Sequence, residues 1–283
     1  MSENLVRDVH DAVARSDSPV EASVRPAATT PRELRALQRD VRRKLALRPG
    51  VSVAEVGCGV GLLGVPVAER AGRYVGLDFA PQAIEVANEA LRAAGVGDRA
   101  CALCVDVLSI DREELRALGR FDRVLVYAVF HYARTEEEAV CFLKRTVELL
   151  APGGRALIGN VPLEDLHADW MSIEPSPHGL IARLIAAARW VMSPGEAPVP
   201  LTRRWKARRT VETLWKSRSA GAGFAPVRLP SNYTLPLTTA AVERWLAALD
   251  GDFLHRWELP APGVPLAFGR ADLIILRRSG ERL

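Results

Sequence analysis

The sequence predicts an α/β protein with a doubly wound, mostly parallel sheet. Between residues 50 and 161, apolar β-branched runs alternate with amphipathic helical patterns, which is typical of parallel strands joined by helices. Three glycines at alternate positions follow the first of these runs, and an acidic residue ends or follows each of the next two. Because the carboxyl ends of parallel strands meet at one edge of the sheet, we expect a ligand site at that edge.

The chain before the first strand should contain two helices and a linker. Residues 1–15 place apolar side chains at helical spacing, and residues 16–31 are rich in Ser, Pro, Ala and Thr. The second helix should begin at Thr30 and Pro31, with Thr as the N-cap and Pro at the first helical position. Its expected buried face consists of Leu34, Leu37, Val41 and Leu45.

A glycine-rich turn follows the first strand. The apolar run at residues 51–56 predicts a short buried strand with Glu55 near its end. Glycines then stand at positions 57, 59 and 61, where the missing Cβ lets the backbone turn sharply and approach a ligand. An apolar helical pattern continues through Ala71, so the free N–H groups of a helix should point into the turn. A tight turn that binds nothing is the simpler alternative.

Two glycine patterns overlap in this turn. Gly59, Gly61 and Gly64 satisfy G-x-G-x-x-G, the fingerprint of dinucleotide-binding turns. The second pattern is E-x-G-C-G-x-G, in which Glu55 stands two residues before Gly57. This second pattern resembles motif I of the class I S-adenosylmethionine-dependent methyltransferases. In that family the acid and the glycines hold the methionine end and the ribose of the cofactor.

Acidic residues also mark the ends of the second and third strands. The second strand, at residues 73–78, ends in Asp78, whose carboxylate could accept hydrogen bonds from both ribose hydroxyls of a nucleoside. The alternative is that Asp78 only caps the following helix, which should run through Ala94. The third strand, at residues 99–105, is followed by Asp106. The resemblance implies that Asp106 accepts a hydrogen bond from the adenine amino group.

Two further segments show the same resemblance. Residues 121–132 (FDRVLVYAVFHY) are similar to the family's fourth strand and the loop after it, and residues 149–158 (LLAPGGRALI) to its turn into the fifth strand. Between them, Thr135 should cap a helix whose acidic first turn favours the helix dipole. His131, just beyond the fourth strand, is a candidate general base for a hydroxyl acceptor. Family members often have a histidine here without catalytic use, so a role in shaping the pocket stays open.

The resemblance implies a Rossmann-like, seven-stranded sheet with an antiparallel last strand, and S-adenosyl-L-methionine as the cofactor. Methyl transfer from a sulfonium requires no metal, and reduced thiols are expected in a cytoplasmic protein. The residues that we expect to bind the cofactor are Glu55, Gly57, Cys58, Gly59, Gly61, Asp78, Phe79, Asp106, Val107 and Tyr127.

The βα alternation breaks after the fifth strand. Residues 162–236 are rich in tryptophan and proline and should form an inserted helical lid over the substrate. A helix at residues 238–249 and strands at 253–259 and 271–277 would complete the sheet, although residues 225–229 are an alternative for the sixth strand. The predicted units are the N-terminal helix and linker (1–31), the cofactor-binding core (32–161), the lid (162–236) and the C-terminal helix and strands (237–283).

Composition, charge and cysteine spacing argue against several classes of protein. The 283-residue chain is 48% hydrophobic and has a formal net charge of +4, with the charges mixed along most of its length. It contains no run of 18 apolar residues and no signal-peptide pattern at residues 1–13, so we expect no membrane segment and no secretion. Cys101 and Cys104 form C-x-x-C within a predicted strand and without a second pair, so we expect reduced thiols rather than zinc.

The acceptor is the open part of the functional prediction. We expect a small-molecule acceptor, by preference a secondary or specialised metabolite that is O-methylated, with N-methylation of a small amine as the alternative. Nucleic acid is not the expected partner, because the [D/N]-P-P-[Y/F] and Pro-Cys motifs of nucleic-acid methyltransferases are absent and the basic run at residues 203–209 has the pattern of a solvated helix face. A non-catalytic binding protein and a nicotinamide-dependent oxidoreductase are the other hypotheses, and a homodimer stays open.

Overall fold

The structure, a computed structural model, describes the predicted core and only parts of the other predicted units. The predicted lid at residues 162–236 lies outside the described residues except at its two ends, and so does the alternative strand at 225–229. The predicted N-terminal helix and linker are described only at Ala14 and from residue 30 onwards. The described residues are 14, 30–165, 235, 237–261, 264 and 270–279.

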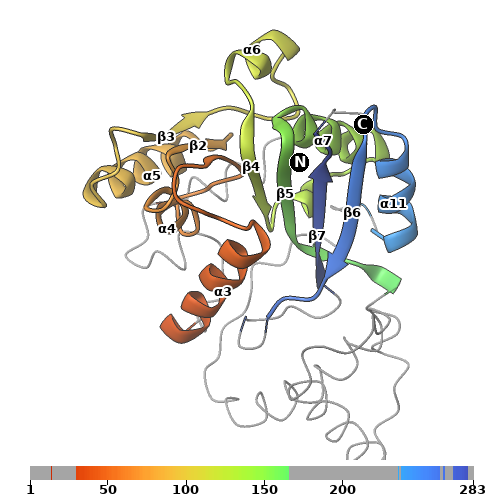
Figure 1. Ribbon diagram of the computed structural model, residues 1–283, viewed down its shortest axis with the longest axis horizontal. Helices are drawn as coiled ribbons and strands as arrows, with labels where there is room; N and C mark the ends of the chain where they lie inside the picture. Colours follow the sequence, from red (N-terminus) through yellow and green to blue (C-terminus); the bar gives the residue numbers. More distant parts are fainter. Residues whose placement is uncertain are drawn as a thin grey trace, which may run out of the picture.

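A seven-stranded sheet of the doubly wound type organises the described residues (Figure 1). The strand order is β3-β2-β1-β4-β5-β7-β6; neighbouring strands from β3 to β5 are parallel, and β7 is antiparallel to both β5 and β6. The predicted fold class, a mostly parallel Rossmann-like sheet with an antiparallel last strand, is therefore confirmed. The strands are β1 (Ser52–Val56), β2 (Arg73–Asp78), β3 (Ala100–Cys104), β4 (Phe121–Tyr127), β5 (Leu150–Pro162), β6 (Phe253–Glu258) and β7 (Arg270–Arg277).

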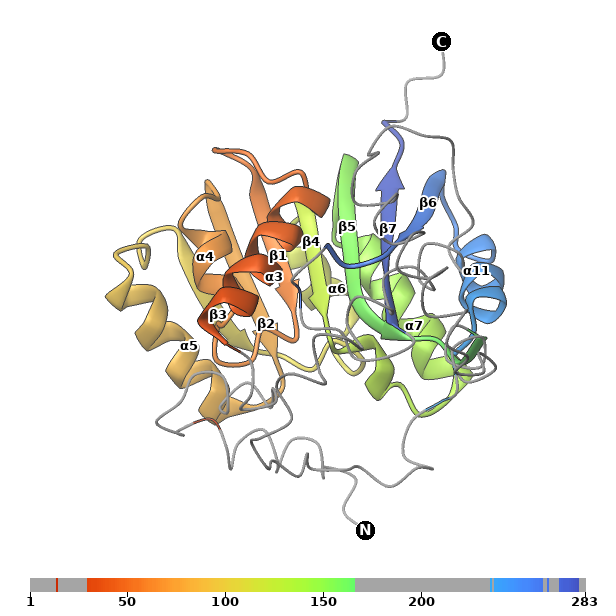
Figure 2. The same ribbon diagram turned by 90° about the horizontal axis from the view of Figure 1, so that it is seen from below.

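Helices cover both faces of the sheet (Figure 2). Side chains of α3, α4 and α5 pack into one apolar cluster with the sheet, and side chains of α6, α7 and α11 pack into a second cluster on the other face. The helices are α3 (Pro31–Lys44), α4 (Gly64–Ala68), α5 (Pro81–Ala93), α6 (Arg112–Ala117), η1 (Phe130–Tyr132, a 3₁₀ turn), α7 (Glu136–Glu148) and α11 (Thr239–Ala247).

Local signals in the sequence set the starts of α3 and α7. The Thr30 side chain accepts a hydrogen bond from the backbone N–H of Glu33, and the Glu33 carboxylate accepts one from the N–H of Thr30, which completes a capping box. Thr135 accepts a hydrogen bond from the N–H of Glu138 at the start of α7. Both predicted caps are confirmed, and each is worth about 1 kcal/mol to its helix.

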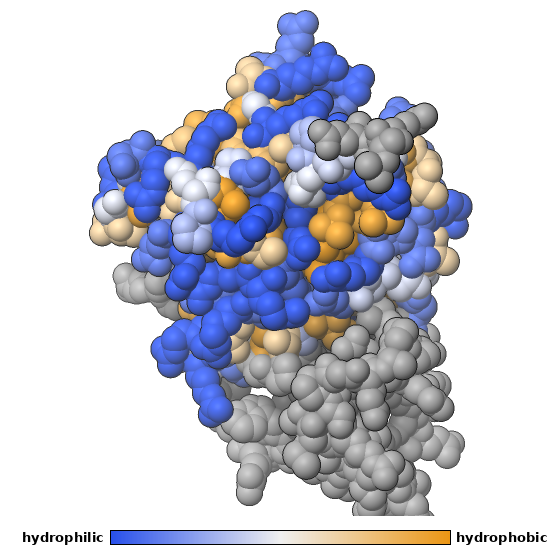
Figure 3. All heavy atoms as spheres, in the orientation of Figure 1, coloured by the Kyte–Doolittle hydropathy of each residue, from blue (hydrophilic) through white to orange (hydrophobic). Residues whose placement is uncertain are grey.

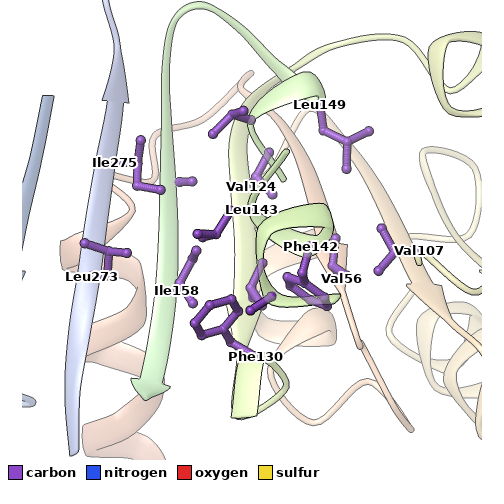
Figure 4. Close-up of a cluster of buried hydrophobic side chains, with 14 of the residues drawn as sticks. Val56, Val107, Val124, Phe130, Phe142, Leu143, Leu149, Ile158, Leu273 and Ile275 are labelled. Atoms are coloured by element: carbon purple, nitrogen blue, oxygen red, sulfur yellow. The ribbon is translucent and has the colours of Figure 1, made fainter. Parts of the chain in front are cut away.

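The larger apolar cluster lies between the sheet and α7 (Figure 4). Phe142 of α7 meets Phe130 of η1 edge to face, with ring centroids 5.8 Å apart. Leu143 and Ile158, which lie close to this pair in Figure 4, are fully buried. Each fully buried side chain of this size contributes about 1.5–3 kcal/mol to folding, so the cluster fixes the fourth and fifth strands that bear part of the site.

The outer edge of β3 is protected by a side chain. The amide of Asn88 in α5 donates to the carbonyl of Ala102 and accepts from its N–H, both at 2.9 Å. These two bonds occupy groups that would otherwise face an approaching strand. The surface seen in Figure 3 is largely hydrophilic, with hydrophobic side chains in small patches. None of the helices in the described ranges has the length and hydropathy needed to cross a bilayer.

A buried ionic cluster joins α3 to β7. The ammonium group of Lys44 is 2.8 Å from Asp40 Oδ2, makes a short contact with Asp272 and donates to the carbonyl of Leu259. The side chains of Lys44, Asp40 and Asp272 are 1%, 2% and 1% exposed. The sequence pattern of α3 predicts only its apolar face, so the ionic cluster was not predicted.

Candidate active site

The glycine-rich turn follows β1, and its three glycines have left-handed backbone conformations. Gly57, Gly59 and Gly61 have φ angles of +73°, +50° and +83°, which L-residues with a Cβ adopt only at a cost. The N–H groups of Gly57 and Cys58 both donate to the carbonyl of Leu77 at the end of β2. These bonds tie the turn to the neighbouring strand.

The helix after the turn is shorter than predicted. The sequence pattern suggested a helix through Ala71, but α4 spans only Gly64–Ala68. The left-handed glycines up to Gly61 delay its start. Its single turn provides little helix dipole, so α4 gives little support to the expectation that a helix points its positive end into the turn. The N–H groups of Gly57, Cys58, Gly59 and Gly61 are themselves bonded within the protein.

The first two glycines of the turn have different surroundings. A Cβ added at Gly57 would lie 2.2 Å from a methyl carbon of Val129, so this glycine is required by the packing of the protein. A Cβ added at Gly59 would meet no atom of the described residues within 4 Å. The space beside Gly59 is therefore open to a ligand, and the backbone there can be approached closely.

Asp78 lies against this open part of the turn. Its Oδ2 atom accepts a 2.8 Å hydrogen bond from the N–H of Gly59, and its Oδ1 atom accepts one from the N–H of Ala80. The residue is 5% exposed. The alternative role as a cap of α5 was wrong, because the N-cap of α5 is Ala80 and no side chain caps this helix.

Asp106 follows β3 at the same edge of the sheet. Its Oδ1 atom accepts a 2.9 Å hydrogen bond from the N–H of Leu108, which orients the carboxylate. Val107 beside it is 7% exposed, and Phe79, which follows Asp78, is partly exposed. These residues lie where the resemblance places the adenosine part of the cofactor, and their contacts with it stay predictions.

The fourth strand brings Tyr127 and His131 to this edge. Tyr127 ends β4 and is 8% exposed, and a Cβ at Gly159 on β5 would lie 2.2 Å from its ring, so Gly159 makes room for it. His131 lies in η1, with its ring centroid 4.4 Å from that of Tyr132. The Nδ1 atom of His131 is buried, while the residue as a whole is partly exposed. The imidazole is therefore held beside the strand ends.

Glu55 and Cys58 lie beneath the turn. They are 2% and 6% exposed, and Glu55 Oε2 accepts a 2.7 Å hydrogen bond from the hydroxyl of Tyr74. Burial, followed by the nearby carboxylates of Asp78 and Glu55, raises the pKa of Cys58 well above its usual value, so it remains a thiol. Direct contact of Glu55 or Cys58 with a cofactor stays a prediction.

The structure also explains Gly64, the last glycine of the dinucleotide-type pattern. Gly64 is the first residue of α4, and a Cβ there would lie 2.1 Å from the Tyr74 hydroxyl and 2.8 Å from Glu55 Oε2. This glycine accommodates an internal pair of side chains. The match to G-x-G-x-x-G therefore has a packing cause.

Two strained residues at the strand ends were missed. Ala128 and Asn160 both have φ of +61°, and they follow residues that pair between β4 and β5, Tyr127 and Gly159. The N–H of Ala128 donates to the carbonyl of Gly159. Left-handed non-glycine residues cost about 1–3 kcal/mol each and tend to cluster at functional sites. Asn is one of the residues that tolerates this conformation, but Ala128 has no such signal in the sequence.

The cysteines and the possible metal ligands can also be located in the structure. All four cysteines are free, and Cys101 and Cys104 are exposed on β3. Within the described parts of the chain, no group of three or more His, Cys, Asp or Glu side chains has an arrangement that could hold a metal ion.

Known proteins resemble this chain in its core. Residues 54–156 match the family model described as a methyltransferase domain. A ubiquinone biosynthesis O-methyltransferase of Azorhizobium caulinodans is 34% identical over 119 residues, which are 41% of this chain and 43% of that protein. A 23S rRNA (uracil(1939)-C(5))-methyltransferase, RlmD, of Bordetella pertussis is 29% identical over 121 residues, 43% of this chain and 24% of that protein. The chain thus spans less than half the length of these curated relatives.

A solved structure resembles the whole chain. The N-methyltransferase NodS of Bradyrhizobium japonicum, crystallised with S-adenosyl-L-homocysteine, superposes with a TM-score of 0.53. The match covers 96% of this chain and 97% of NodS at 14% sequence identity, which shows a common fold. Together with the sheet order, this shows that the chain has the Rossmann-like fold of methyltransferases, and residues 54–156 match the model of a methyltransferase domain.

Proposed function

We propose that this protein transfers the methyl group of S-adenosyl-L-methionine to a small-molecule acceptor. One observation supports this most strongly: the glycine turn, Asp78, Asp106 and His131 all leave the carboxyl ends of neighbouring parallel strands. Ligands of doubly wound sheets bind outside this edge. Four separate polar or flexible features at one edge favour a site over a coincidence of loops.

The residues present fit this cofactor. The open space beside Gly59 allows the amino-acid part of the cofactor to approach the backbone, and Asp78 borders it. The cofactor has no phosphate, which agrees with a turn followed by only a single helical turn at α4. Asp106 would accept a hydrogen bond from the adenine amino group, and Phe79, Val107 and Tyr127 would supply apolar contacts.

When bound, S-adenosylmethionine supplies an electrophilic methyl group. The protein must then hold the acceptor in line with it, exclude water and remove one proton from the nucleophile. His131 would accept that proton if the nucleophile is a hydroxyl, because a neutral hydroxyl is a weak nucleophile. The name of the Azorhizobium relative, an O-methyltransferase, supports this preference.

N-methylation of a small amine is the second candidate, and the name of NodS favours it. A neutral amine needs no strong base, so His131 would then only shape the site. A third candidate is a protein that binds the cofactor without transferring its methyl group. RNA methylation, suggested by the name of RlmD, is a further outcome that the same experiment can detect.

Two measurements test the proposal. Calorimetry should show that the full-length chain binds S-adenosylhomocysteine and does not bind NAD. Incubation with methyl-labelled S-adenosylmethionine and separate panels of phenols, catechols, small amines and ribosomal RNA should label a phenol or catechol. Failure to bind S-adenosylhomocysteine would contradict the cofactor; binding without label in any panel would support a non-catalytic protein, and label only in amines or RNA would contradict the hydroxyl preference.

A further inference from the structure

A buried tyrosine lies beneath the glycine turn and is part of neither the predicted nor the proposed cofactor contacts. Tyr74 is in β2 opposite Val53, and its side chain extends along the sheet to Glu55, two residues further along β1. The hydroxyl donates a 2.7 Å hydrogen bond to Glu55 Oε2, and the two residues are 1% and 2% exposed. A hydrogen bond to a buried charged group is among the stronger kinds in proteins.

Two glycines make the space for this hydroxyl. A Cβ added at Gly76 would lie 3.0 Å from the Tyr74 oxygen, and one added at Gly64 would lie 2.1 Å from it. Neither Gly64 nor Gly76 has a positive φ angle, so backbone freedom does not account for them. Both positions are instead occupied by glycine because a larger residue would overlap the tyrosine.

Cys58 of the turn lies near the pair. A Cβ at Gly76 would also lie 2.8 Å from the Cys58 sulfur, so the thiol and the Tyr74 hydroxyl border the same space beside Gly76. Cys58 stands between Gly57 and Gly59, and the N–H of Gly59 donates to Asp78. A shift of Tyr74 and Glu55 would therefore be expected to move the backbone that borders the proposed cofactor site.

The protonation states suit a fixed donor and acceptor. Burial, followed by the charge of Glu55, raises the pKa of Tyr74 well above its usual value, so the phenol keeps its proton. A buried carboxylate needs such donors, because losing one leaves an acceptor whose desolvation is no longer offset. A carboxylate that lost this donor would reorient beside Gly64, the first residue of α4, which follows the glycine turn.

We infer that Tyr74 is a positioning residue for cofactor binding, which acts by holding the Glu55 carboxylate and, through it, the glycine turn. This inference rests on the proposed function, since it concerns the same cofactor site. It assigns to Tyr74 a role at a distance from the ligand, and it explains why Glu55, although acidic and in the family motif, is buried.

The test compares three single variants and one double variant of the 283-residue chain. Tyr74→Phe removes only the hydroxyl, and Glu55→Gln removes the charge but keeps an acceptor. Thr146→Val is the matched control, because its hydroxyl is also buried and bonded, to the carbonyl of Phe142 in α7, on the other face of the sheet. For each variant the Kd for S-adenosylhomocysteine is measured by calorimetry and the melting temperature by circular dichroism.

We expect Tyr74→Phe to raise the Kd by about 10-fold, the effect of losing a hydrogen bond to a charged group, while Thr146→Val lowers the melting temperature without changing the Kd. The double variant Tyr74→Phe/Glu55→Gln should show less than the product of the two single effects, because the residues act as one unit. A Kd within twofold of wild type for Tyr74→Phe, or fully independent effects, would overturn the inference. Failure of the wild type itself to bind would instead contradict the proposed function.

Discussion

The carboxylate of Asp272 accepts a 2.7 Å hydrogen bond from the backbone N–H of Asn160, in the bulge where β5 loses its regular pairing with β7. Asp272 is held in turn by Lys44 of α3. The carbonyl of Asn160 accepts from Arg270. Charged side chains thus bind both the N–H and the carbonyl group of Asn160, a strained residue near the end of β5. A bulge of this kind changes the direction of the backbone beside a site.

Lys44→Met should destabilise the protein strongly. It would leave the buried carboxylates of Asp40 and Asp272 without their shared cation, and breaking a buried ionic cluster by removing one member costs about 3–5 kcal/mol. Urea denaturation followed by circular dichroism measures the loss. Lys144→Met, an exposed lysine of α7, is the control and should change stability by less than about 0.5 kcal/mol. Equal midpoints for the two variants would show that the cluster contributes no net stability.

Ala128→Gly should leave stability unchanged or raise it by about 1 kcal/mol. The φ of Ala128 is +61°, where alanine is strained and glycine is not. The same substitution at Ala90, inside α5, should lower stability by about 1 kcal/mol, because glycine is a poor helix former. Comparable losses at both positions, measured by denaturant unfolding, would mean that Ala128 is not strained in solution.

Gly59→Ala should abolish most cofactor binding while the protein still folds. Among the described residues, the added methyl group meets no atom within 4 Å, so it would occupy the space proposed for the cofactor. Gly50→Ala is the control: Gly50 also has a positive φ, +84°, and an added Cβ there likewise meets no atom of the described ranges within 4 Å, but it lies before β1. Both variants should lose similar stability from backbone strain, and only Gly59→Ala should raise the Kd for S-adenosylhomocysteine. A normal Kd for Gly59→Ala would place the cofactor elsewhere.

Asp78→Ala should weaken cofactor binding by roughly 1.5–3 kcal/mol, the range for hydrogen bonds to charged groups. The variant removes a proposed ribose contact and also the bond to the N–H of Gly59. Asp111, the N-cap of α6, likewise accepts from two backbone N–H groups, of Glu113 and Glu114. Asp111→Ala should therefore cost about 1 kcal/mol of stability and leave the Kd for S-adenosylhomocysteine unaltered. If the two variants bind equally well, the ribose assignment fails.

His131→Ala should lower methyl transfer to a hydroxyl acceptor by about 10²–10⁴-fold with little change in cofactor affinity. The variant removes the imidazole that we propose accepts the hydroxyl proton as the new C–O bond forms. For the wild type, turnover should fall as the pH is lowered, because a protonated imidazole cannot accept a proton. Single-turnover measurements with His255→Ala, an exposed histidine on β6, provide the control. Nearly full turnover in His131→Ala would assign the residue to packing.

The sequence was a good guide where its signals are local. Thr30 and Thr135 cap their helices as predicted, and the glycines at 57, 59 and 61 mark a left-handed turn. The alternation of short apolar strands and amphipathic helices was enough to predict the parallel part of the sheet. In each case the residues that determine the local structure lie within a few positions of it in the chain, so the sequence alone is enough to predict it.

The parts that were missed depend on residues far apart in the chain. Lys44 and Asp272 are 228 positions apart, and charged residues on a helix such as α3 usually face water. Tyr74 has the pattern of an ordinary strand residue, and nothing near it in the sequence shows that its hydroxyl reaches Glu55. Gly64 fitted a ligand-binding pattern, although its cause is the space that Tyr74 needs. Only the tertiary arrangement separates these explanations.

The position of β7 between β5 and β6 has a consequence for how the protein is made. The strand that fills the middle of this half of the sheet, Arg270–Arg277, is the last of the described strands in sequence, and it also provides the partner of Lys44 in α3. During synthesis, β5 must therefore wait with an unpaired edge until residue 277 has left the ribosome. Such edges can pair with other strands, so the chain is exposed to aggregation until β7 has been made.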